Sequence, residues 1–173
     1  MADIDVRDLT ETDWPIYREL RLAALRESPG AFVGTYADES QRDDKFWLNR
    51  IHQAHRFVAE RDATPVGVVG LGAHGDNPED GEVFDLWVAP DARASHVAIA
   101  LVAAAAKQAA DEGRTRLYFW VLSESAPAIA FAGNFGFRPT SKRRPTTEDS
   151  EDEVAMVLSL SADPRSPANS WLP

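Results

Sequence analysis

The chain has 173 residues, of which 44% are hydrophobic and 27% are charged, and its formal net charge is −10. This composition predicts one globular domain with a substantial core. The negative charge disfavours nucleic acid as a partner, because binding to phosphates needs a basic surface. The chain has no cysteine, which excludes disulfides, thiol nucleophiles and thiolate metal sites.

No apolar run is long enough to span a bilayer, and the acidic segment 1–13 does not have the pattern of a signal peptide. We therefore expect a cytoplasmic protein with no membrane partner. The negative charge would also concentrate a cationic substrate such as an amine, although acidity that serves solubility alone is the simpler interpretation.

Hydrophobic periods and turn residues predict a mixed α/β order of elements. In chain order they are a strand over 3–7, a helix over 14–27, a helix around 46–51 with Ser40 and Asp43 as its capping box, a hairpin of 56–59 and 66–73, an exposed loop over 74–81, a strand over 82–88, a helix over 96–112, a strand over 117–122, a helix after Ser125 to about 134, and a strand over 154–160. A crossover between the strands at 82–88 and 117–122 predicts that these two are parallel.

Two segments are predicted to lie outside this framework. The residues from Lys142 to Glu153 carry a basic run and then an acidic run, which is typical of a solvated hairpin tip. Residues 162–173 are rich in proline and serine and predict a loosely ordered tail. The domain would therefore occupy residues 1–161.

The junction from Val88 to Ala98 is the most informative segment for chemistry. A strand ends there, a turn follows, and a helix begins. The unpaired N–H groups and the dipole at such a helix start favour an anion, for example a pyrophosphate. Arg93 would add a cation. An ordinary strand-to-helix connection remains the alternative.

This junction resembles the acetyl-CoA motif of the GNAT N-acetyltransferase superfamily. The segment 86–97 is similar to the strand, Val-x-Pro turn and helix start of that motif, 20–32 is similar to the first helix and substrate loop, and 128–137 is similar to the closing helix and short strand. The resemblance implies a central, mostly antiparallel sheet of six to seven strands with about four helices. It also implies acetyl-CoA as co-substrate and a primary amine of a small molecule or protein as acceptor.

The resemblance implies a set of cofactor-binding residues on the strand end, the turn and two helix starts. They are Leu86, Trp87, Val88, Arg93, Ala94, Ser95, His96, Val97, Ala98, Ser125, Ala128 and Phe131.

Four positions depart from the family pattern. Ala94 and His96 stand where glycines are usual, Ser125 replaces an asparagine, and Ala132 replaces the tyrosine that often protonates the thiolate. These departures keep two alternatives open. One is a GNAT-fold binding or regulatory protein with a degenerate acetyl-CoA site, and the other is a transferase that uses another acyl-CoA.

Acetyl transfer to an amine needs a base, an acid and donors to the oxyanion. Glu82 resembles the general-base position of some members, although an exposed strand glutamate is an equal alternative. Tyr118 is the candidate acid, although a sheet aromatic is the simpler interpretation. The family analogy makes the Val88 N–H the oxyanion donor. Asp85, three residues after Glu82, should face the other side of the strand.

The acceptor pocket is expected from 28–39 and the loop after Phe137. Asp38 and Glu39 would suit a cationic amine, or they are exposed residues that cap a helix. No metal is expected, since His52 and His55 lack a third ligand. A homodimer is left open.

Overall fold

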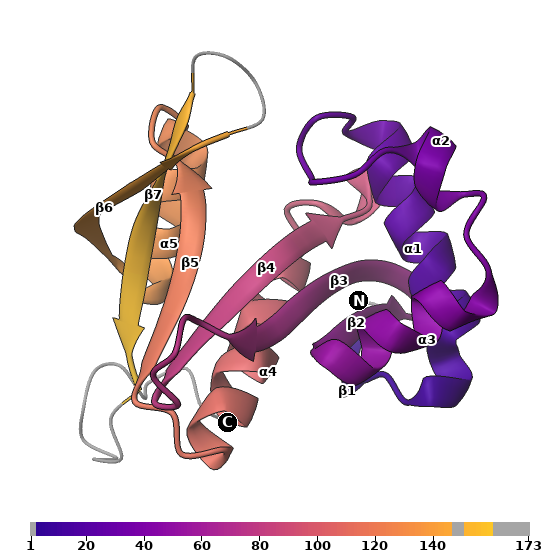
Figure 1. Cartoon of the computed structure of the whole chain (residues 1–173), viewed down its shortest axis with the longest axis horizontal. Helices are drawn as coiled ribbons and strands as arrows, with labels where there is room; N and C mark the ends of the chain where they lie inside the picture. Colours follow the sequence, from indigo (N-terminus) through magenta and orange to yellow (C-terminus); the bar gives the residue numbers. More distant parts are fainter. Residues whose placement is uncertain (1–2, 147–150, 161–173) are drawn as a thin grey trace. The chain divides into compact units, whose positions relative to one another are not determined.

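The structure is a computed structural model that describes residues 3–146 and 151–160 (Figure 1). Its elements are β1 (Ile4–Asp8), the 3₁₀ turn η1 (Glu11–Asp13), α1 (Trp14–Glu27), α2 (Tyr36–Glu39), α3 (Asp44–Gln53), β2 (His55–Arg61), β3 (Thr64–Ala73), β4 (Asp80–Val88), the 3₁₀ turn η2 (Pro90–Ala92), α4 (Val97–Asp111), β5 (Arg116–Leu122), α5 (Ala126–Phe135), β6 (Arg138–Pro145) and β7 (Asp152–Ser159).

The strands hydrogen-bond in the order β1-β2-β3-β4-β5-β7-β6. The pairs β1/β2, β2/β3, β5/β7 and β6/β7 are antiparallel, and β4/β5 is parallel. A parallel pair needs a long connection, which α4 supplies. The expected fold class, a mixed but mostly antiparallel sheet of six to seven strands with helices, is confirmed.

The chain forms two compact units, which are described separately. Of the described residues, the first unit contains 3–72 and 85–105, and the second contains 73–84, 106–146 and 151–160. Strand β4 contributes its first half to the second unit and its last four residues to the first. No helix in the part of the chain described here is long and apolar enough to cross a membrane.

The core of the first unit is built by the apolar faces of α1 and α3 together with β2 and β3. Trp47 of α3 is fully buried and meets Tyr17 of α1 edge to face, with ring centroids 5.7 Å apart. Leu20 and Leu25 of α1 and Val58 of β2 belong to the same buried cluster. The predicted helical spacing of α1 is confirmed, and it fixes which face of this helix packs inward.

The core of the second unit lies around β5 and β7. Leu117 of β5, Ala155 and Leu158 of β7 and Phe137 after α5 are almost completely buried. Phe119 meets Phe137 edge to face at 5.7 Å between centroids. Gly136 ends α5 with φ +127°, a backbone angle that glycine adopts without a steric penalty.

Three sequence-based expectations are wrong. Asp43 is the N-cap residue of α3, where its side chain accepts from the Phe46 N–H, because Ser40 has helical angles at the end of α2 and cannot cap α3. Residues 142–144 belong to strand β6, since Arg143 and Arg144 pair with Val154 and Glu153 of β7.

The third concerns the predicted loop over 74–81, which ends earlier than expected. Asp80 and Gly81 are buried residues of β4, where they pair with Arg116 and Leu117 of β5. The predicted tail, 162–173, lies outside the described residues, and the extent of the domain stays a prediction.

Candidate active site

The strand-turn-helix junction predicted from the sequence is present in the first unit. Strand β4 ends at Val88, the turn η2 follows, and α4 begins at Val97. The carbonyl of His96 accepts the first helical hydrogen bond, from the Ala100 N–H at 3.0 Å. The N–H groups of the residues just before Ala100 therefore have no acceptor within the helix and are oriented for an anion.

Ala94 and His96, at the positions where the resemblance places glycines, both have positive φ angles. Their φ values are +66° and +64°, in the left-handed region that glycine favours. A residue with a Cβ pays about 1–2 kcal/mol for this conformation. The backbone of the turn thus keeps a glycine-like path, while two side chains are added to it.

Arg93 is paired with a carboxylate that sequence reasoning did not identify. Its Nη2 donates to Glu27 Oε2 at 3.0 Å, and its Nε donates to the Val88 carbonyl at 3.0 Å. The Trp87 indole N–H donates to the same Glu27 oxygen at 3.0 Å. Hydrogen bonds from Ser28, Trp87 and Arg93 lower the pKa of Glu27 to about 2. Glu27 ends α1, and no local motif marks it.

The other predicted cofactor residues of this unit differ in exposure. Trp87, Val88 and Val97 are buried, while Leu86, Ser95 and Ala98 are half-buried. Gly67 of β3 lies beneath this junction, because a Cβ there would meet Leu101 Cδ1, the Trp87 carbonyl and Val97 Cγ1 at 3.0–3.1 Å. The buried side chains therefore hold the junction in place, and their backbone is what a cofactor could contact.

Glu82 lies in the second unit, in the half of β4 that pairs with β5. Its register partner is Tyr118. Glu82 Oε1 accepts from Trp120 Nε1 at 3.0 Å and lies 2.8 Å from His74 Nδ1. Glu82 Oε2 has no hydrogen-bond partner among the described residues, and the side chain is 20% exposed. One carboxylate oxygen is thus held in place, and the other makes no hydrogen bond to the described residues.

Tyr118 and His74 form a stacked pair beside this carboxylate. Their ring centroids are 4.0 Å apart and the planes are 12° from parallel. The sequence identified Tyr118 but missed His74, which was assigned to an exposed loop. No local sequence pattern marks His74 as a site residue. In the hairpin between β3 and β4, the His74 N–H donates to the Asp80 carbonyl, and this contact brings residue 74 beside the start of β4.

Helix α5 contains the remaining predicted cofactor residues. Ser125 caps it, because its hydroxyl accepts from the Ala128 N–H at 3.3 Å. Ala128 and Phe131 are half-buried, and Ala132 is completely buried. The predicted site residues therefore fall into two groups, with residues 86–98 in the first unit and Glu82, Tyr118, Ser125, Ala128 and Phe131 in the second.

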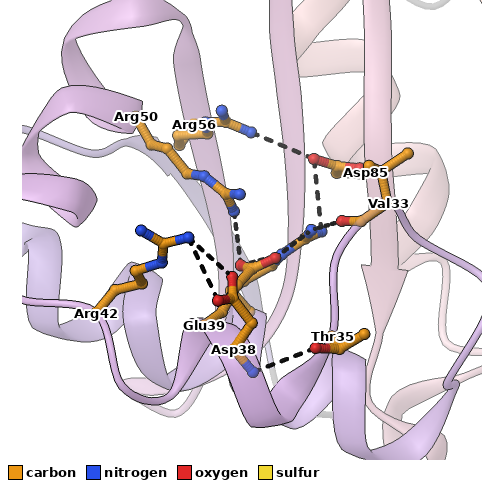
Figure 2. A network of polar contacts seen from close by, with 9 residues as sticks. Val33, Thr35, Asp38, Glu39, Arg42, Arg50, Arg56 and Asp85 are labelled. Atoms are coloured by element: carbon orange, nitrogen blue, oxygen red, sulfur yellow. Dashed lines mark hydrogen bonds and ion pairs between the residues drawn. The ribbon is translucent and has the colours of Figure 1, made fainter.

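Glu39, expected at the surface, is a buried carboxylate in the first unit, with arginine side chains around it (Figure 2). Its carboxylate accepts from Arg21 Nε at 3.1 Å, Arg21 Nη2 at 3.2 Å and Arg50 Nη1 at 2.8 Å. Arg21 also donates to the Val33 carbonyl. The prediction that Glu39 is an exposed capping residue is wrong, because two long arginine side chains supply the partners that its burial requires.

Asp85 joins the same group of charges from β4. Its Oδ2 lies 3.6 Å from Arg21 Nη1 and 3.6 Å from Arg56 Nη1, and Figure 2 shows the contact with Arg56. The φ angle of Asp85 is +55°, which interrupts the regular strand. Asp85 and Glu82 therefore take part in different networks, as the three-residue spacing suggested.

The described histidines do not gather into a metal site. His52 lies 3.1 Å from Glu11 and His55 lies 2.7 Å from Asp8. No group of three or more His, Asp or Glu residues suited to a metal occurs within the described ranges.

Solved structures with this architecture include several acetyltransferases. A putative acetyltransferase of Salmonella typhimurium, solved with its cofactor acetyl-CoA, gives a TM-score of 0.74 at 15% identity and covers 92% of this chain and 95% of its own. A ribosomal-protein-alanine N-acetyltransferase of Brucella melitensis gives 0.71 at 21% identity, over 88% and 98% of the two chains.

Sequence comparison points the same way. An uncharacterized N-acetyltransferase of Methanocaldococcus jannaschii is 30% identical over 138 residues, which cover 76% of this chain. The alignment spans only 59% of the length of that relative. The Acetyltransferase (GNAT) family profile matches residues 7–137, a stretch that includes both the helix start after Val88 and the strand that carries Glu82. With this match and the fold in agreement, the chain belongs to the GNAT acetyltransferase family.

Proposed function

We propose that this protein transfers the acetyl group of acetyl-CoA to a primary amine by direct attack, with Glu82 as the general base. The observation that carries the proposal is the asymmetric setting of the Glu82 carboxylate. Two groups hold Oε1, and Oε2 remains to take the amine proton. Trp120 and His74 act as positioning residues for this carboxylate.

The first unit supplies groups that suit the cofactor. The free N–H groups at the start of α4 and the glycine-like turn at Ala94 and His96 fit a pyrophosphate. Acetyl-CoA brings the activated acetyl group as a thioester. The new C–N bond forms as the C–S bond breaks, Glu82 takes the proton of the amine, and Tyr118 is the proposed donor of a proton to the thiolate.

A second candidate is a GNAT-fold binding protein with little or no catalysis. Two observations favour it. Arg93, the cation predicted to bind phosphate, is already paired with Glu27. Ala132 is buried and has no hydroxyl to protonate the thiolate. Both candidates should bind acetyl-CoA in a calorimetric titration. A protein that no longer binds the cofactor would show no heat of binding. Release of thiol with a panel of amines separates the two candidates from each other.

The decisive variant is Glu82→Gln, since the amide keeps the shape of the side chain and an acceptor for Trp120 but is a poor base. We expect kcat to fall by about 10²–10⁴-fold with acetyl-CoA affinity unchanged. The matched control is Glu79→Gln, the same change at an exposed residue just before β4. Full activity of Glu82→Gln would assign proton acceptance to another group.

A further inference from the structure

Two cationic side chains of β6 lie on the aromatic rings that surround Glu82. The Lys142 Nζ is 5.4 Å from the centre of the Tyr118 ring, and the Arg144 guanidinium carbon is 4.4 Å from the centre of the Trp120 ring. Tyr118 is the register partner of Glu82, and Trp120 donates to its carboxylate. Each cation therefore lies on a ring of β5 that neighbours the proposed base in the sheet or contacts it.

The register of the second unit explains why these two residues reach the rings. Arg144 pairs with Glu153 of β7, and Glu153 pairs with Leu122 of β5, so Arg144 shares a face with residues 118, 120 and 122. Trp120 pairs with Ala155, whose small side chain leaves room above the indole. Arg143 points to the other face because side chains alternate along a strand.

Both cations retain capacity to bind an anion. Arg144 donates from Nε to Glu153 at 2.5 Å, and its Nη groups have no hydrogen-bond partner among the described residues. Lys142 has no carboxylate partner within the ranges that the structure describes. Although the whole chain carries a net charge of −10, β6 places two cations on the rings of Tyr118 and Trp120.

The acidic residues that were expected to attract a cationic amine are already engaged. Glu39 is buried between Arg21 and Arg50, and Asp38 pairs with Arg42 at 3.1 Å. Glu39 is therefore not available to a positively charged acceptor, and Asp38 already has a cation beside it. The two charged side chains that lie on the aromatic rings beside Glu82 are both cations.

We propose that Lys142 and Arg144 form a carboxylate-binding subsite beside Glu82, so that the acceptor is a small amine that also carries a carboxylate. The proposal rests on the proposed function of Glu82 and adds the substrate class. An ammonium and a guanidinium together suit a carboxylate. The same cations favour the neutral form of a nearby amine, which is the form that attacks.

The ends of β6 favour a small acceptor over an extended peptide. β6 is the last strand in the sheet order, and Pro139 and Pro145 lie near its two ends. Proline has no N–H to donate, and proline in an edge strand disfavours the addition of a further strand.

The test compares each common L-amino acid with its own carboxamide as acceptor, using thiol release from acetyl-CoA. The wild type should prefer the acid over the amide in kcat/KM by about 10- to 100-fold for at least one pair, the range expected for hydrogen bonds to a charged group. Lys142→Met and Arg144→Met should lose rate on the acid and keep rate on the amide. Lys142→Arg should retain most of the preference, and Arg143→Met should leave it intact because that residue faces away.

The other outcomes overturn the proposal in distinguishable ways. Equal rates on acid and amide in the wild type would leave the acetyltransferase standing and remove the subsite. Weaker acetyl-CoA binding in Lys142→Met, with the acid preference unchanged, would assign the cation to the cofactor instead. No turnover with either member of any pair would overturn the subsite, and no turnover with the wider amine panel as well would overturn the proposed function.

Discussion

Arg93 donates to Glu27 at 3.0 Å, so the cation predicted to meet the cofactor phosphates already has a carboxylate partner. The Arg93 side chain is 49% exposed and Glu27 is 31% exposed, which means that solvent screens the pair. An incoming phosphate would compete with a weak internal contact. If Arg93 binds a phosphate as proposed, we expect the pair to lower cofactor affinity modestly.

The first prediction follows from this competition. Glu27→Gln should tighten acetyl-CoA binding by about 2- to 5-fold, because it releases Arg93 from an opposing charge of surface-pair strength. Calorimetric titration at low ionic strength measures the change. Asp91→Asn is the matched control. Asp91 lies in the turn just before Arg93, but its carboxylate pairs with Arg61 of β2, so the change leaves the contacts of Arg93 intact. An equal gain in acetyl-CoA affinity in both variants would mean that the change in net charge causes it, and not the release of Arg93.

The second prediction concerns acid stability. Hydrogen bonds from Ser28, Trp87 and Arg93 lower the pKa of Glu27 from 4.5 to about 2, so its ionised form stabilises the fold above pH 4.5. This contribution is lost as the pH falls from 4.5 to about 2. Urea unfolding across that range should show the wild type and Glu27→Gln converging at low pH. A difference in stability that does not change with pH would contradict the assignment.

The third prediction tests the left-handed turn. Ala94→Gly should raise the free energy of unfolding by about 1 kcal/mol, because glycine has no Cβ to strain at φ +66°. Ala63→Gly is the matched control, with φ +64° in the turn between β2 and β3, and it should stabilise the protein similarly without any effect on acetyl-CoA binding. Destabilisation by Ala94→Gly alone would mean that its methyl group makes contacts that outweigh the strain.

The fourth prediction concerns the buried charges of the first unit. Glu39→Gln should destabilise the protein by about 3–5 kcal/mol, because it leaves Arg21 and Arg50 without the carboxylate that compensates their burial. Asp38→Asn, next to it on the same short helix, should cost less than about 0.5 kcal/mol, since its pair with Arg42 is exposed. Chemical denaturation of the two variants provides the comparison, and similar small losses would be inconsistent with a structural role for Glu39.

The long periodic elements could be predicted from the sequence because local pattern and burial agree in them. Helices α1 and α4 and the hairpin of β2 and β3 lie close to their expected positions. Strand β6 was missed because nearly all its residues are exposed and it shows no alternation. Pairing with β7 defines that strand, and this pairing is a tertiary interaction that no local pattern encodes.

The sequence singled out Glu82 and Tyr118 as candidates for the site, and their roles stay predictions. The groups that orient Glu82 come from positions 8 and 38 residues away in the chain, so no local pattern marks them. The burial of Glu39 was missed for a similar reason, because Arg21 and Arg50 belong to two other helices. Such partners are distant in the chain and are brought together by tertiary packing, which patterns in a single sequence do not reveal.

The last prediction concerns His96, whose side chain is added to the glycine-like turn at the start of α4. We expect His96→Gly to weaken acetyl-CoA binding, because it removes an imidazole that would donate to a phosphate oxygen. Ala94→Gly serves as the control, since both variants relieve a left-handed residue and only one removes a donor. Calorimetric titration of the two variants therefore separates strain from ligand contact. Tighter binding by His96→Gly would instead identify the imidazole as an obstruction and favour the binding-protein alternative.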